Sequence, residues 1–242
     1  MSRYLGRIAA VSLTVGVLSL TLAWAIGGRD FLHVFDRGRF LAASCSDTKS
    51  GDTERHLAWS GDAIDIALPG TVHYRFGEGS DIVVRGAPGT IAHVEVRGGR
   101  LVLNCGWSGS AREVEVTLPG QTLRRVALSG SGKLDMDNLG QRELALTISG
   151  SGSVQARGEV RHLSVKLAGS GNAQLAELAA KRLSVDIAGS GNVEAAPQDE
   201  ANIHISGSGN VRLVTRPGHM RSHIAGSGRI IQAPLEAAEG KK

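Results

Sequence analysis

Aromatic residues are scarce in this sequence, at 4% of its 242 positions, whereas 33 positions are glycine. This composition favours thin stacked strands with tight bends over an enzyme cleft lined by aromatic rings. Nucleic-acid-binding proteins commonly carry basic clusters with interleaved aromatic residues, and no such cluster occurs here. Both signs of charge are interspersed, and the formal net charge is only +4 at pH 7. We therefore expect an ordinary solvated surface and no nucleic acid partner.

The most regular feature of the chain is the triplet Gly-Ser-Gly, which occurs six times with a near-fixed period of about 19 residues. Such a period predicts a repeat architecture in which stacked copies bury what one copy cannot. The glycines are expected at the bends between strands, where φ turns positive or backbones come close. They are Gly130, Gly132, Gly150, Gly152, Gly169, Gly171, Gly189, Gly191, Gly207, Gly209, Gly226 and Gly228.

Apolar residues alternate with polar or small ones on both sides of each triplet. In the third copy, Val165 and Leu167 precede the triplet, and Ala173 and Leu175 follow it. Period-two alternation predicts two short half-buried strands per repeat, and stacking at ~4.8 Å would pair each strand with its equivalent in the next copy. We predict an all-β protein, a right-handed parallel β-helix or solenoid. An antiparallel meander or sandwich of the same strands is the alternative.

The segments between repeats, such as 137–142 and 176–181, are too long for two-residue turns. Each carries a further apolar residue, Leu139, Val160 or Leu178, which predicts a third side of the coil. Residues 57–121 are also expected to be strands, including a hairpin that turns at Gly98-Gly99. We expect this region to start the same solenoid or to cap its first rung.

The N-terminus carries a long uncharged run. Arg3 and Arg7 precede the residues from Ile8 to Ile26, whose length is near that of a membrane-spanning helix. Ala23-Trp24-Ala25 resembles a signal-peptide cleavage site. The run is therefore either a signal peptide or an uncleaved helical anchor, and both predict an exported chain. An anchored chain would face the periplasm or the cell exterior, with residues 8–26 in the membrane, and a cleaved one would be periplasmic or secreted.

These features divide the chain into four parts. Residues 1–26 are the signal peptide or anchor, 27–56 a juxtamembrane linker, 57–234 the β-solenoid, and 235–242 a polar tail. Cys45 and Cys105 are the only cysteines. In an exported chain the two could form a disulfide, and two unpaired cysteines are the alternative.

The order of the strands is similar to that of one bacterial family. Ala63-Ile64-Asp65-Ile66 and Val72-His73-Tyr74-Arg75-Phe76 come first, Val94-Glu95-Val96 turns into Leu101-Val102-Leu103, and the serial Gly-Ser-Gly units follow. Over residues 58–233 this resembles the family described as putative autotransporter adhesin, head GIN domain. The resemblance implies a β-helix-like fold and an exported location, and it implies no catalytic residues.

Three residues before the first glycine of successive triplets lie Lys166, Asp186, His204 and His223. They are expected to face outward, so that Asp186, His204 and His223 stand on successive rungs. A carboxylate and two imidazoles form a candidate transition-metal set. The alternative is a solvated ladder with a Lys166–Asp186 pair, and we predict no bound metal and no cofactor.

Two further ladders are expected after the triplet. Asn172, Asn192 and Asn210 form a partial asparagine ladder, and Glu194 and Arg212 are expected to pair across rungs.

No catalytic constellation stands out in the sequence. Asp135 and Asp137 both belong to the first repeat, whereas hydrolysis by paired carboxylates needs two acids across a cleft. We predict a non-catalytic, adhesin-like binding protein of the cell envelope that contacts a glycan or an envelope protein. An enzyme acting on polysaccharide, and a sensory or assembly protein of the envelope, are the alternatives. The oligomeric state is left open.

Overall fold

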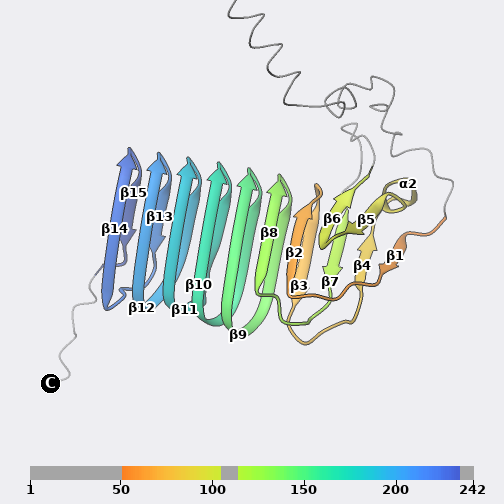
Figure 1. Cartoon of the computed structure of the whole chain (residues 1–242), viewed down its shortest axis with the longest axis horizontal. Coiled ribbons are helices and arrows are strands. Elements are labelled where there is room, and N and C mark those ends of the chain that lie inside the picture. The colour runs from red at the N-terminus through yellow and green to blue at the C-terminus, as the bar shows by residue number, and fades with distance from the viewer. Residues whose placement is uncertain (1–50, 105–113, 235–242) are drawn as a thin grey trace, which may run out of the picture. The chain divides into compact units, whose positions relative to one another are not determined.

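The structure, a computed structural model, describes residues 51–104 and 114–234 (Figure 1). The predicted N-terminal helix, most of the linker, the polar tail, Cys45 and Cys105 lie outside these ranges. No helix in the part that the structure describes is long and apolar enough to span a membrane.

Four long strands form the centre of the fold and stack in parallel (Figure 1). They are β9 (Lys133–Gly150), β10 (Ser153–Gly169), β11 (Asn172–Gly189) and β12 (Asn192–Gly207). Equivalent residues are register partners on both sides of each triplet, so that Gly150 lies beside Gly169 and Gly169 beside Gly189, and the register shifts only in the connectors. The parallel β-solenoid is thereby confirmed, and the antiparallel meander is wrong.

The strands are longer than expected. We predicted two short strands per repeat, but between successive triplets the four central segments each form one strand of 16 to 18 residues that bends around the coil. The reason is that the connectors also pair from rung to rung: Glu159 is the register partner of Gly140 and of Ala179. The connectors therefore form the third side of the coil, and Leu139, Val160 and Leu178 are buried there as predicted.

The first rung comes from β2 (Ala63–Ala67) and β3 (Thr71–Arg75), which are joined at Pro69-Gly70. Strand β2 pairs in parallel with β8 (Arg125–Gly130), and β3 pairs in parallel with the start of β9. Residues 57–121 thus start the solenoid, as expected.

A cap of short strands covers the N-terminal side of this rung. It consists of β1 (Glu54–Leu57), β4 (Ile82–Arg85), the short helix α2 (Pro88–Ile91), β5 (Val94–Arg97), β6 (Arg100–Leu103) and β7 (Glu115–Leu118). The hairpin of β5 and β6 is confirmed, with positive φ at Gly98 and Gly99. The order in space is not that of the sequence, because β2 lies between β6 and β8. Helix α2 was not predicted, and β1 begins inside the segment expected to be linker.

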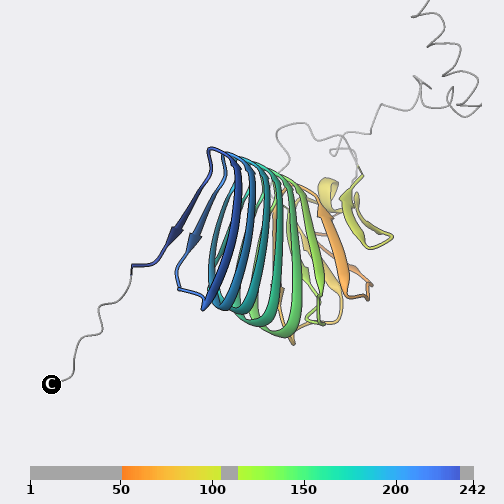
Figure 2. The same cartoon turned by 60° about the vertical axis from the view of Figure 1, so that its left-hand side comes forward.

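The other end of the coil is formed by β13 (Asn210–Leu213), β14 (His219–Gly226) and β15 (Arg229–Gln232). Strands β14 and β15 pair in parallel with β12 and β13, and both are seen clearly in Figure 2. The alternation of inward apolar residues weakens in this last rung. Met220 and Ile224 are each 40% exposed there, whereas Ile205, the residue before Ile224 in the ladder, is fully buried.

The two glycines of each triplet serve different purposes. The first has a positive φ in all six copies, and Gly189 at +133° is an example. The second lacks a positive φ but leaves no room for a side chain. A Cβ on Gly191 would lie 2.3 Å from the carbonyl oxygen of Gly171 and 2.4 Å from Cδ2 of Leu167. The triplet therefore allows both the bend and the close approach of successive rungs.

Candidate functional site

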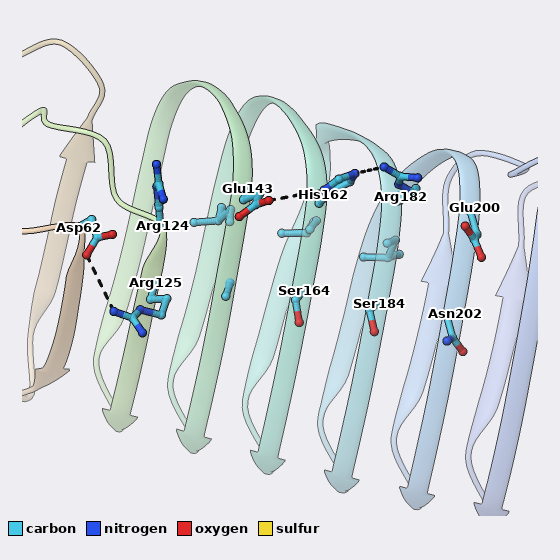
Figure 3. A pocket seen from close by; sticks show the side chains of 14 residues that line it. Asp62, Arg124, Arg125, Glu143, His162, Ser164, Arg182, Ser184, Glu200 and Asn202 are labelled. Carbon is cyan, nitrogen blue, oxygen red and sulfur yellow. Dashed lines mark hydrogen bonds and ion pairs between the residues drawn. The ribbon is translucent and has the colours of Figure 1, made fainter.

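A groove runs across several rungs on one side of the coil. It lies on the strand segments that lead into the triplets, which we call the groove face (Figure 3). Its volume is about 780 Å³, within the range of ~300–1,000 Å³ typical of small-molecule and cofactor sites. Because each rung contributes equivalent residues, the groove crosses the strands and follows the axis of the solenoid.

The floor of the groove is a ladder of small side chains. Ala145, Ser164, Ser184 and Asn202 are consecutive register partners on β9, β10, β11 and β12. The residues on either side of them in sequence, such as Leu163 and Val165, point into the core and are buried. The small outward residues therefore leave the hollow, and the two serines and the asparagine offer it donors and acceptors.

One rim of the groove carries both acidic and basic side chains, two residues before the floor ladder. Glu143, His162, Arg182 and Glu200 are register partners on successive rungs. Nδ1 of His162 lies 3.9 Å from the Glu143 carboxylate, and its Nε2 contacts the Arg182 guanidinium (Figure 3). The rim is thus a polar row with little net charge.

The groove continues towards the N-terminal cap. A second hollow of about 520 Å³ shares Arg125, Ala145 and Ser164 with the first and extends to Asp65 and the hairpin turn at Gly98. Ser129 donates a hydrogen bond of 3.0 Å to Asp65 beside it. Together the two hollows form one elongated site that an extended chain could follow.

Asp186, His204 and His223 were predicted to face outward on successive rungs. In the structure they form the row next to the groove floor. The three are register partners on β11, β12 and β14, and all are exposed. The rings of His204 and His223 stack with their centroids 5.1 Å apart, and Asp186 does not complete a three-ligand set. No group of three metal-ligating side chains occurs within residues 51–104 and 114–234. Lys166 and Asp186 are register partners, but they make no ion pair in this part of the chain.

The side of the coil that follows the triplets, the opposite face, is held by pairs across rungs. Nδ2 of Asn192 donates to Oδ1 of Asn172 at 3.1 Å, and Asn210 donates to Asn192 at 3.0 Å. Arg212 lies 3.4 Å from Glu194. Both the asparagine ladder and the Glu194–Arg212 pair are therefore confirmed.

The two acids considered for catalysis also lie on the opposite face. Asp135 contacts Lys133 at 2.9 Å and His73 at 3.7 Å. Arg157 donates to Asp137 at 2.9 Å and contacts Glu177 at 3.1 Å. The Asp137 hydrogen bond and the nearby Glu177 charge raise the pKa of Arg157. Asp135 and Asp137 come from one strand and line neither hollow of the groove.

The groove residues were not singled out from the sequence. The signal that could have revealed them is a row of small residues five positions before the first glycine of each triplet: Ala145, Ser164, Ser184 and Asn202. Aligned copies show this row, but only stacked rungs show that large residues flank it. A row of small side chains predicts a hollow only once its neighbours are known to be register partners.

The fold and the groove define a parallel β-solenoid with an elongated surface site that combines apolar, hydroxyl and charged side chains. The chain belongs to the family described as putative auto-transporter adhesin, head GIN domain, whose model matches residues 62–217. The expected resemblance is thereby confirmed. No curated protein matches the sequence.

Two solved structures are similar to this chain. A putative adhesin from Bacteroides fragilis has 18% identity and a TM-score of 0.58, over 76% of this chain and 98% of that one. A putative lipid binding protein from Parabacteroides distasonis also has 18% identity, with a TM-score of 0.48 over 75% of this chain and 96% of that one. At 18% identity, the likeness to the Bacteroides fragilis protein shows the fold alone.

Proposed function

We propose that this protein is an exported, non-catalytic binding protein of the cell envelope, and that its groove holds an extended glycan chain. The observation that carries the proposal is the floor ladder of Ala145, Ser164, Ser184 and Asn202, whose small side chains continue one hollow along the axis. The family and the putative adhesin of similar fold support an adhesin-like role.

The chemistry of the groove suits a largely uncharged polymer. Hydroxyl and amide groups of the floor can donate to and accept from sugar hydroxyls, and the rim carries both acidic and basic side chains rather than one sign of charge. Repeated weak contacts to a polymer add up because each further sugar binds within an already formed complex. An extended segment of an envelope protein is the competing ligand.

The test is binding to an array of bacterial envelope glycans, with matched variants of the protein. Ser184→Trp places an indole in the groove, and Ser153→Trp places the same indole on the opposite face. We expect the wild type and Ser153→Trp to bind the same glycans and Ser184→Trp to lose at least tenfold in affinity. Equal binding by both variants, or binding only to envelope proteins, would refute the glycan proposal.

Export requires a separate test. Arg3, Arg7 and the run from Ile8 to Ile26 support a signal peptide or an anchor. The mature chain from the native host should begin near Ile26 if the signal is cleaved, or carry the intact Met1 end in the membrane fraction if it is an anchor. Recovery of the intact chain in the soluble cytoplasm would contradict export.

A further inference from the structure

A row of three cations crosses consecutive rungs at the corner between the third side and the groove face. We call Arg142, Arg161 and Lys181 the cation ladder. Arg142 lies opposite Arg161, because the residues before and after them are register partners: Gln141 with Val160, and Glu143 with His162. The corresponding pairs on the next rung place Arg161 opposite Lys181. All three side chains are exposed.

The charges of the cation ladder are not paired. None of its three members forms an ion pair with any residue of the described ranges, although charged partners are common elsewhere on the coil, as for Arg157 and Arg212. Like charges that lie directly opposite on neighbouring strands repel one another. Successive rungs are ~4.8 Å apart, well within the ~8–10 Å over which charges interact at ordinary salt concentrations. The ladder is therefore an uncompensated cationic row, which a bound anion would stabilise.

The ladder borders a hollow with room for a ligand. The hollow has a volume of about 620 Å³, and its lining includes the three cations. The floor of the hollow is the adjoining row of Gly140, Glu159 and Ala179. Glycine and alanine have little or no side chain, so the hollow is deepest at the two ends of this row. Glu159 stands at the centre and supplies one negative charge against three positive ones.

We propose that the cation ladder binds an acidic polysaccharide, a linear chain with one carboxylate on most of its sugars. Successive rungs are ~4.8 Å apart, so a linear chain laid along the axis can bring carboxylates of its sugars to the cations of several rungs. Arginine suits this task because its planar fork donates two hydrogen bonds to one carboxylate. The site is separate from the groove and does not depend on the groove's ligand.

The test measures binding of the full chain to oligogalacturonate of six to eight sugars (a probe length set by the ladder's few rungs), with the neutral galactose oligomer and single galacturonate as comparison ligands. The ladder variant carries glutamine at Arg142, Arg161 and Lys181. The charge-matched control carries glutamine at three exposed arginines on other surfaces, Arg85 and Arg97 in the cap and Arg229 after the last triplet.

We expect the acidic oligomer to bind, more weakly as salt rises, and the neutral oligomer and the monomer not to bind at the same concentrations. The ladder variant should lose at least tenfold in affinity, and the control variant less than threefold. Glu159→Gln should bind more tightly than the wild type, because it removes the acid from the hollow. The ladder variant should unfold at the same urea concentration as the wild type or a higher one, because its repulsion is relieved.

Three outcomes would overturn the proposal: equal losses in the ladder and control variants, weaker binding by Glu159→Gln, or tight binding of polyphosphate without binding of oligogalacturonate. The groove variant Ser184→Trp should keep its affinity for the acidic oligomer. Failure of the groove proposal is thereby distinguishable from failure of the ladder proposal.

Discussion

The glycines of the coil allow the contributions of backbone conformation and of space to be measured separately. At Gly140 neither backbone conformation nor space opposes a side chain: φ is not positive, and no atom lies within 4 Å of where an alanine Cβ would be. Gly130 has a φ of +98° but equally open surroundings. Gly191 lacks a positive φ but is closely packed. Gly189 has a φ of +133°, and a Cβ added to it would also lie 2.3 Å from the carbonyl oxygen of Gly169.

The expected costs follow from these four environments. Gly140→Ala should change the free energy of unfolding by less than about 0.5 kcal/mol. Gly130→Ala should cost about 1–2 kcal/mol, the penalty of a left-handed backbone with a Cβ. Gly191→Ala should cost about 3 kcal/mol, the upper end of overpacking, because the obstacle is a backbone oxygen that its own rung holds in place. Gly189→Ala combines both penalties and should cost about 4 kcal/mol or more.

The assay is urea unfolding followed by circular dichroism, with the midpoint compared among the four variants at a constant slope. A common midpoint for Gly191→Ala and Gly140→Ala would refute the role assigned to the second glycine. Equal costs at Gly130 and Gly189 would show that close approach of the rungs adds nothing to the φ penalty.

Three further changes probe the inward, outward and buried polar positions. Ile187→Asp should destabilise by about 3–5 kcal/mol because it buries an unpaired charge, whereas Asp186→Ala should change stability by less than about 0.5 kcal/mol in urea; equal effects would contradict the assigned facing. Asn192→Ala removes both of its ladder hydrogen bonds and should cost about 1 kcal/mol in the same assay, and no change would show that water replaces them. Burial raises the pKa of Tyr74 to about 12, above the value of ~10 in an unfolded chain, so its contribution to stability is complete below pH ~10 and is lost as the pH rises to about 12. Absorbance titration should show a late tyrosinate step that Tyr74→Phe lacks, and a single step near pH 10 would contradict the burial.

The repeats could be predicted from the sequence because every copy obeys the same constraints. Val165, Leu167, Ala173 and Leu175 alternate in one copy as their equivalents do in the others, and all four are buried. The register followed from the identity of the copies, since pairing Gly150 with Gly169 also aligns every apolar position. Local pattern and global fold agree there, which is why the prediction was correct.

The cap was less predictable because it lacks repeated units. Strand β2 takes its partners from β6 and β8, about 35 and 60 residues further along the chain, and no local pattern specifies that order. The helix α2 is only one turn long, and its Pro88-Gly89 start is typical of a turn. The sites were missed for a related reason. Arg142, Arg161 and Lys181 stand 19 and 20 residues apart, but they lie in connectors whose pairing was not expected.

The same geometry explains why a solenoid of this kind suits polymers rather than small ligands. A residue type repeated in the sequence becomes a row with a spacing of ~4.8 Å, so Ser164 and Ser184 present two equivalent contacts, as do Arg142 and Arg161. A single sugar can use only one such contact, whereas a chain uses several and gains from their high effective concentration. Affinity at both sites should therefore rise steeply with ligand length until the chain spans the ladder, and then level off.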